Sequence, residues 1–234
     1  GDLDGALESF NKSIDMDPQY AMPFYNRGLV RREKGDLAGE IKDYSKAIEL
    51  DPNYLQAYYN RALAREENGD LDGSIADCEA ILKIDPKNAR AFYNRGIARG
   101  QKGDLDGSIA DNTLAIASDA GYTQAYYNRA LARAQKGDLA GSIADNTQVI
   151  KLEPNNAEAY YNRGAAHYKL KDYDETITDF DKAASLNAAY KAKALAVMAS
   201  NHARGSSSGR PAEGLGFHPA PEGGAAGREV GGSV

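Results

Sequence analysis

Residues 92–96 read Phe-Tyr-Asn-Arg-Gly, and this pentapeptide decides the fold because it returns along the chain at a constant interval. Each related pentapeptide begins with an aromatic residue, ends with Gly or Ala, and starts 34 residues after the previous one. They occupy residues 24–28, 58–62, 92–96, 126–130 and 160–164. A fixed period of roughly 20 to 50 residues is the signature of a repeat protein, in which each repeat is one supersecondary unit.

Each repeat is predicted to contain two helices. In residues 55–88, apolar residues recur with a period near 3.6 residues in two separate runs. Gly69 is expected to end the first helix, because glycine adopts a left-handed backbone at little cost, and Asp70 would cap the second. Pro86 would stop the second helix, since proline cannot continue it. Lys171 replaces the glycine in the last repeat, where a left-handed backbone would cost about 1 kcal/mol or the turn would differ.

The repeat length, the helix–turn–helix pattern and several signature positions resemble the tetratricopeptide repeat (TPR) family over residues 1 to about 204. The large aromatic residue and the small residue four positions later fit the family pattern, as in Phe92 and Gly96. Arginines stand where the family has Leu and a later Tyr, as in Arg95 and Arg99, which marks a subtype. The Asn-Arg-Gly and Gly-Asp-Leu strings resemble those of bacterial TPR proteins. The resemblance implies an all-α fold, a right-handed α-solenoid of TPR helix–turn–helix hairpins.

The repeats predict the organisation of the whole chain. Residues 1–20 match the second helix of a repeat alone, and residues 191–204 would be a capping helix with Ala194, Leu195, Val197 and Met198 inward. Five full repeats lie between them, at 21–54, 55–88, 89–122, 123–156 and 157–190. Residues 205–234 are rich in Gly, Pro and Ser and are expected to be disordered, whether native, added or out of frame.

Composition excludes several functional classes. A formal net charge of −6 argues against nucleic-acid binding or attachment to anionic membranes through overall charge, and no apolar run approaches the roughly 20 residues of a membrane-spanning helix. The single cysteine, Cys78, rules out an internal disulfide or a cysteine-cluster zinc site, and its apolar helical setting predicts a buried side chain. No phosphate loop, metal-ligand spacing or nucleophile–base pattern occurs. We therefore predict a protein that is not an enzyme and uses no cofactor or metal.

The first residue is Gly1, and no signal peptide follows it, so we expect a piece of a longer protein whose compartment stays unknown.

Every full repeat carries an arginine and, 16 residues later, an aspartate. We predict a ladder of partly buried Arg–Asp pairs between the two helices of each hairpin, which would specify register more than add stability. The alternative is that the charges are solvated independently. The predicted pairs are Arg27–Asp43, Arg61–Asp77, Arg95–Asp111, Arg129–Asp145 and Arg163–Asp179.

The resemblance implies a concave groove lined by the first helices, with a column of tyrosines beside a column of aliphatic residues. Such a surface suits a protein partner that presents a peptide or an amphipathic helix. The alternative is that the tyrosines only cover the inner surface. The lysine and asparagine that grip a carboxylate in chaperone-binding members are absent, so that activity is not predicted. The predicted groove residues are Tyr25, Tyr59, Leu63, Arg90, Tyr93, Ile97, Tyr127, Leu131 and Tyr161.

The function we predict is a non-catalytic protein–protein interaction scaffold. One alternative is a self-assembling structural scaffold, because the stripe Leu3, Leu7, Phe10 and Ile14 in residues 1–20 could dock on another copy. The other is an interaction module of a longer protein.

Overall fold

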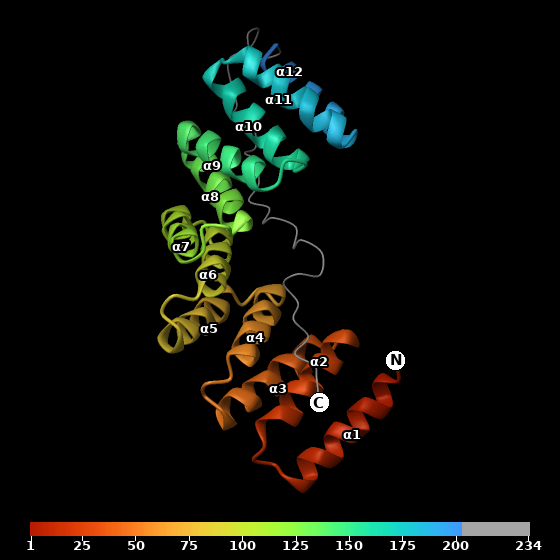
Figure 1. Cartoon of the computed structure of the whole chain (residues 1–234). Helices are drawn as coiled ribbons and strands as arrows, with labels where there is room; N and C mark the ends of the chain where they lie inside the picture. The colour runs from red at the N-terminus through yellow and green to blue at the C-terminus, as the bar shows by residue number, and fades with distance from the viewer. Residues whose placement is uncertain (203–234) are drawn as a thin grey trace. The chain divides into compact units, whose positions relative to one another are not determined.

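The structure is a computed structural model that describes residues 1–202, and within this range every regular element is a helix (Figure 1). The predicted all-α helical repeat fold is confirmed. The segment 205–234, expected to be disordered, lies outside the described residues. The helices are α1 (Leu3–Met16), α2 (Ala21–Glu33), α3 (Leu37–Leu50), α4 (Leu55–Glu67), α5 (Leu71–Ile84), α6 (Ala89–Gln101), α7 (Leu105–Ser118), α8 (Thr123–Lys136), α9 (Leu139–Leu152), α10 (Ala157–Leu170), α11 (Tyr173–Leu186) and α12 (Ala189–His202).

The helices belong to two compact units. The first unit, Gly1–Gly103, contains α1 to α6, and the second begins at Asp104 and contains α7 to α12. Inside each unit, every helix packs on the helix that follows it in the chain (Figure 1). The boundaries proposed for the individual repeats remain a prediction.

The helix ends follow from short-range chemistry. The side chains of Asp2, Asp36, Asp70, Asp104 and Asp138 each accept a hydrogen bond of 2.9 Å from a glycine amide three residues later. These bonds satisfy an amide that the helix itself leaves unpaired. Between the two helices of a hairpin, Gly69 and Gly137 adopt φ angles of 79° and 85°. Lys171 takes the same left-handed conformation with φ 70°, so the turn is kept in spite of the side chain.

Aromatic side chains fill the space between the paired helices α2 and α3 and between α10 and α11. Tyr44 is fully buried in the first unit, and Phe180 is buried in the second. Each lies over a glycine: a Cβ placed on Gly28 would come 2.6 Å from Tyr44, and one on Gly164 would come 2.9 Å from Phe180. Glycine at these two positions is therefore required by close packing.

Helix α12 packs against α10 and α11, and the Tyr168 hydroxyl donates to the Met198 carbonyl at 3.1 Å. Ala194 is buried and Val197 and Met198 pack against its cluster, as expected. The inward placement of Leu195 was wrong, because Leu195 is 56 % exposed. The other three residues share one helical face by their spacing of three and four, and Leu195 lies about 100° from Ala194 on that helix.

Candidate functional site

Several of the predicted groove residues are more buried than the residues of an open binding surface would be. In the first unit Tyr25 is 5 % exposed and Tyr93 is 8 % exposed, and in the second unit Tyr127 is 4 % exposed. Ile97 and Leu131 are also buried. The more accessible members of the predicted set are half-buried: Tyr59, Leu63, Arg90 and Tyr161.

Tyr25 shows how a tyrosine of this column is held. Its ring centroid lies 4.9 Å from that of Tyr54 and 5.7 Å from that of Tyr44. Its hydroxyl accepts a hydrogen bond of 3.0 Å from the Asn60 side-chain amide, which comes from the next first helix, α4. Burial raises the pKa of Tyr25 against the lowering effect of this bond. The tyrosine thus joins successive hairpins within the first unit.

Tyr59 and Arg90 form a more accessible arrangement on α4 and α6. The Arg90 guanidinium carbon lies 4.7 Å from the centre of the Tyr59 ring, within the range of a cation–π contact. The Tyr59 hydroxyl donates to the Asn88 side-chain oxygen. Burial raises the pKa of Tyr59 to about 12, with the positive charge of Arg90 opposing the rise. We call Tyr59, Leu63 and Arg90 the Tyr59 patch.

In the second unit, Tyr161 lies between two aromatic rings. Its ring centroid is 5.4 Å from Phe180, in a stacked arrangement, and 5.3 Å from Tyr190. Burial raises its pKa. Here too the ring serves hairpin packing, and only part of it is accessible.

The arginines and aspartates of the predicted ladder meet inside four hairpins. In each, two guanidinium nitrogens donate to the two carboxylate oxygens, as in Arg129 Nε and Nη2 with Asp145 at 2.9 and 2.7 Å. The same forked arrangement joins Arg27 to Asp43, Arg61 to Asp77 and Arg163 to Asp179. Of the fifth predicted pair, Arg95 lies in the first unit, 3.8 Å from Glu79, and Asp111 is buried in the second.

The arginines of these four pairs also reach the preceding second helix. In each, the remaining nitrogen, Nη1, donates to a polar side chain on that helix, 16 residues earlier. The acceptors are Asn11 for Arg27, Ser45 for Arg61, Thr113 for Arg129 and Thr147 for Arg163. One guanidinium therefore ties three helices together, which a lysine could not do in the same planar geometry.

Sequence reasoning missed a second arginine on the same aspartates. Arg65, one helical turn after Arg61, places Nη1 2.9 Å from Asp77 and 3.1 Å from the Gly73 carbonyl. Arg31 and Arg133 make the corresponding contacts with Asp43 and Asp145. The signal was available, because these arginines recur with the repeat and lie within one helical turn of the ladder arginine.

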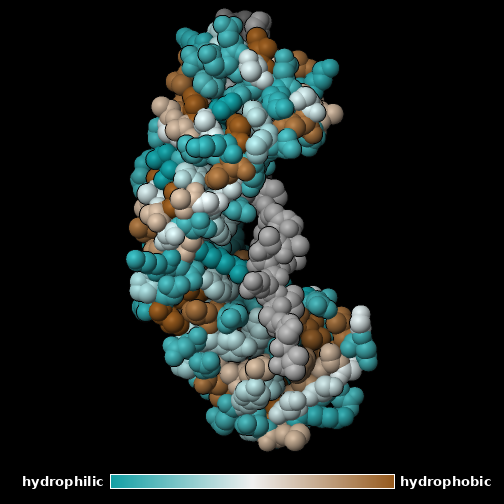
Figure 2. Space-filling model, in the orientation of Figure 1, coloured by the Kyte–Doolittle hydropathy of each residue, from teal (hydrophilic) through white to brown (hydrophobic). Residues whose placement is uncertain are grey.

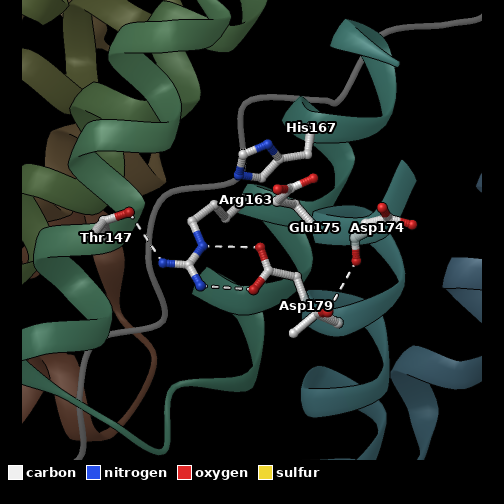
Figure 3. Close-up of a pocket in the computed structure, with 7 residues that line it drawn as sticks. Thr147, Arg163, His167, Asp174, Glu175 and Asp179 are labelled. Atoms are coloured by element: carbon white, nitrogen blue, oxygen red, sulfur yellow. Dashed lines mark hydrogen bonds and ion pairs between the residues drawn. The ribbon is translucent and has the colours of Figure 1, made fainter. Parts of the chain in front are cut away.

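The last hairpin differs, because His167 occupies the place of the second arginine. Its Nδ1 lies 3.3 Å from the Asp172 carboxylate and does not reach Asp179. A cavity of about 290 Å³ opens here. It is lined by Thr147, Arg163, His167, Asp174, Glu175, Thr178 and Asp179. Figure 3 shows Arg163 and Asp179 joined by two hydrogen bonds, with His167 and Glu175 beside them.

Residues 1–202 contain no group of three or more His, Cys, Asp or Glu side chains able to hold a metal ion. None of the helices in this range is long and apolar enough to cross a membrane.

Comparison with solved structures finds helical repeat proteins. A crystal structure of MamA is 27 % identical, with a TM-score of 0.66, over 71 % of this chain and 96 % of that one. A MamA structure from Desulfovibrio magneticus RS-1 is 17 % identical, with a TM-score of 0.67, over 72 % of this chain and 96 % of that one. YrrB, described as a TPR protein with an unusual peptide-binding site, is 21 % identical with a TM-score of 0.67. That match covers 85 % of this chain and 99 % of YrrB.

No curated protein sequence matches this chain. Family models do match most of its helical part. A TPR repeat model matches residues 28–69 and 132–171, and two tetratricopeptide repeat models match residues 59–123 and 157–190. With the helical hairpins, their shared aspartate caps and these matches, the chain belongs to the tetratricopeptide repeat family.

Proposed function

We propose that this TPR protein binds a peptide or helix of a protein partner through the accessible residues of its first helices. TPR repeats are generally non-catalytic interaction modules, which supports an interaction scaffold as the general role. The observation that carries the finer proposal is the Tyr59 patch, where a half-buried aromatic ring, a guanidinium and a leucine come from two successive first helices.

The chemistry of the patch indicates what it would bind. Leu63 and the exposed part of Tyr59 offer apolar contact, and Arg90 offers a charge to a carboxylate. A partner segment with an apolar side chain next to an acidic one fits both. On the face drawn in Figure 2, hydrophobic residues form scattered clusters among hydrophilic ones. That face therefore offers no single continuous apolar band to a partner. The net charge of −6 supports a protein partner rather than a nucleic acid.

A peptide-library selection on the full chain tests this proposal. Arg90→Glu should abolish enrichment of the selected motif, because it reverses the charge at the patch without removing a core side chain. Lys83→Glu, an equal charge change at an exposed position of α5, is the matched control and should leave enrichment unchanged. Variants of Tyr93 or Tyr127 would be poor probes, since both rings are buried. A motif that survives Arg90→Glu would refute the Tyr59 patch as the binding site.

A second candidate is self-association through residues 1–20. One observation favours it: none of the residues of α1 is buried, and the stripe Leu3, Leu7, Phe10 and Ile14 is only half-covered. Replacing Leu7 and Phe10 by lysine should then remove any concentration dependence of the molecular mass in sedimentation. A mass that is independent of concentration in the unaltered chain would eliminate this candidate.

A further inference from the structure

The cavity beside His167 can be compared with the same position in other hairpins of this chain. In three sibling hairpins, a second arginine inserts its guanidinium between the ladder aspartate and a glycine carbonyl. Its Nη1 lies 3.0 Å from Asp43 in one hairpin, 2.9 Å from Asp77 in the next and 2.8 Å from Asp145 in the third. In these three hairpins the repeat framework therefore holds a guanidinium at this place.

In the last hairpin the Arg163–Asp179 pair is kept, but the second guanidinium is missing and Glu175 replaces the glycine of the siblings. Asp179 still pairs with Arg163, and Arg163 still reaches Thr147. Among residues 1–202, Arg163 is the only arginine bonded to Asp179, whereas each sibling aspartate named above has two. The shorter His167 side chain leaves the volume of about 290 Å³ open, close to the small end of the roughly 300–1,000 Å³ typical of ligand sites.

The charges around the cavity have also changed in favour of a cation. Glu175 stands at the repeat position that Gly39, Gly73 and Gly141 hold in the siblings, so a carboxylate has been added at the rim. Asp174 adds a second exposed carboxylate, and the lining also includes the carboxylate of Asp179, which is more than nine-tenths buried. With one arginine in the lining against three carboxylates, the cavity carries an excess of negative charge even without counting His167.

We propose that this cavity binds the guanidinium group of an arginine side chain presented by a partner polypeptide. The incoming group would lie where Arg31, Arg65 and Arg133 place theirs, facing Asp179 and the rim carboxylate of Glu175. A planar guanidinium suits this place better than an ammonium, because it donates to two acceptors in fixed directions.

The residues that α10 contributes to this cavity lie on a different face of the helix from Tyr161, its predicted groove residue. On α10, Arg163 and His167 lie roughly 200° and 240° around the helix from Tyr161, at about 100° per residue. A partner can therefore occupy the cavity without contacting Tyr161. Failure of the Tyr59 patch to bind a peptide would leave this proposal unaffected.

The test uses the full chain and the short blocked peptide Ala-Arg-Ala, followed by NMR shifts of the Thr147, Glu175 and Thr178 amides. We expect saturable shifts at these residues. The same peptide with lysine should bind at least several-fold more weakly, and the peptide with citrulline, which has the shape of arginine but no charge, should not bind detectably. Equal binding of the citrulline peptide would overturn the assignment to a guanidinium.

Two variants test whether the NMR shifts arise from peptide bound in the cavity. His167→Arg fills the cavity with a guanidinium-bearing side chain, so it should abolish peptide binding. Glu175→Gln removes a rim charge at an exposed position that does not affect packing, and it should weaken binding several-fold in a folded chain. Lys169→Arg, which adds an arginine on the same helix at an exposed position outside the lining, should leave peptide binding unchanged. Shifts that persist unchanged in both His167→Arg and Glu175→Gln would refute the site.

Discussion

Removal of Asp77 should destabilise the chain strongly, because this one carboxylate serves two arginines. It accepts from Arg61 Nε at 3.0 Å, from Arg61 Nη2 at 2.5 Å and from Arg65 Nη1 at 2.9 Å. The Asp77 side chain is 2 % exposed, and those of Arg61 and Arg65 are 13 % and 23 % exposed. Breaking a buried ion pair on one side costs about 3–5 kcal/mol. Both arginines keep another acceptor, Ser45 or the Gly73 carbonyl, so we expect about 2–4 kcal/mol for Asp77→Leu.

A double-mutant cycle separates the interaction from the loss of each side chain. Asp77→Leu, Arg61→Met and the double variant would be compared by urea unfolding, with both the midpoint and the slope measured, since repeat proteins can unfold in parts. We expect a coupling energy of about 2 kcal/mol that survives high salt, because the pair is largely removed from solvent. The matched control is Lys102 with Asp72, an ion pair whose side chains are 38 % and 82 % exposed, for which the coupling should stay below about 1 kcal/mol.

A coupling between Arg61 and Asp77 no larger than that of the control pair would refute the energetic role of the ladder. Such a result would mean that the two charges are stabilised independently by solvent. The ladder would then be a regularity of sequence with no energetic role in the hairpin.

Three further substitutions have definite expected outcomes. Gly28→Ala should lower stability to urea by about 1–3 kcal/mol, because the added methyl group would come 2.6 Å from Tyr44; an unchanged midpoint would show that the ring can move aside. Burial raises the pKa of Glu40 from 4.5 to about 7, so the folded chain binds more protons than the unfolded chain between these values. Stability should therefore fall, by at most about 3 kcal/mol from this group, as the pH rises from 4.5 to 7, and Glu40→Ser should remove that slope in urea titrations across pH. Lys171→Gly should raise the melting temperature through a gain of about 1 kcal/mol, since φ is 70° there, and a loss of stability would show that the lysine side chain is needed.

The helical architecture could be predicted because its determinants are local. A glycine that accepts a positive φ and an aspartate that caps the next helix act within a few residues, so Gly69 and Asp70 mark the turn from sequence alone. The exact 34-residue period then extends one hairpin to the others. At Lys171 the sequence left two outcomes open, and the structure has the left-handed turn, with φ 70°.

The exposure of the predicted groove residues could not be predicted in the same way. Tyr25 recurs like a groove residue, but its exposure depends on how closely the next hairpin approaches, which is a tertiary property. Contacts with Tyr44, Tyr54 and Asn60 bury it. The second arginine was missed for a related reason: a repeated position can contact several neighbours, and spacing alone does not say which acceptor it reaches.

The pairing of exposed charges indicates that neighbouring hairpins are matched to each other. Lys34, Lys102 and Lys136 each bond an aspartate 30 residues earlier, at Asp4, Asp72 and Asp106. Where that earlier position is alanine, at residues 38 and 140, the corresponding later position is Asn68 or Leu170 and carries no positive charge. Such pairs add little stability, but exchanging two hairpins would leave charges without partners, so they favour the natural order. The Arg–Asp pair is shared by four hairpins, whereas the variable positions distinguish one hairpin from another. His167 is informative for that reason: it changes a ladder-contacting position that is arginine in every other full repeat, and a cavity opens there.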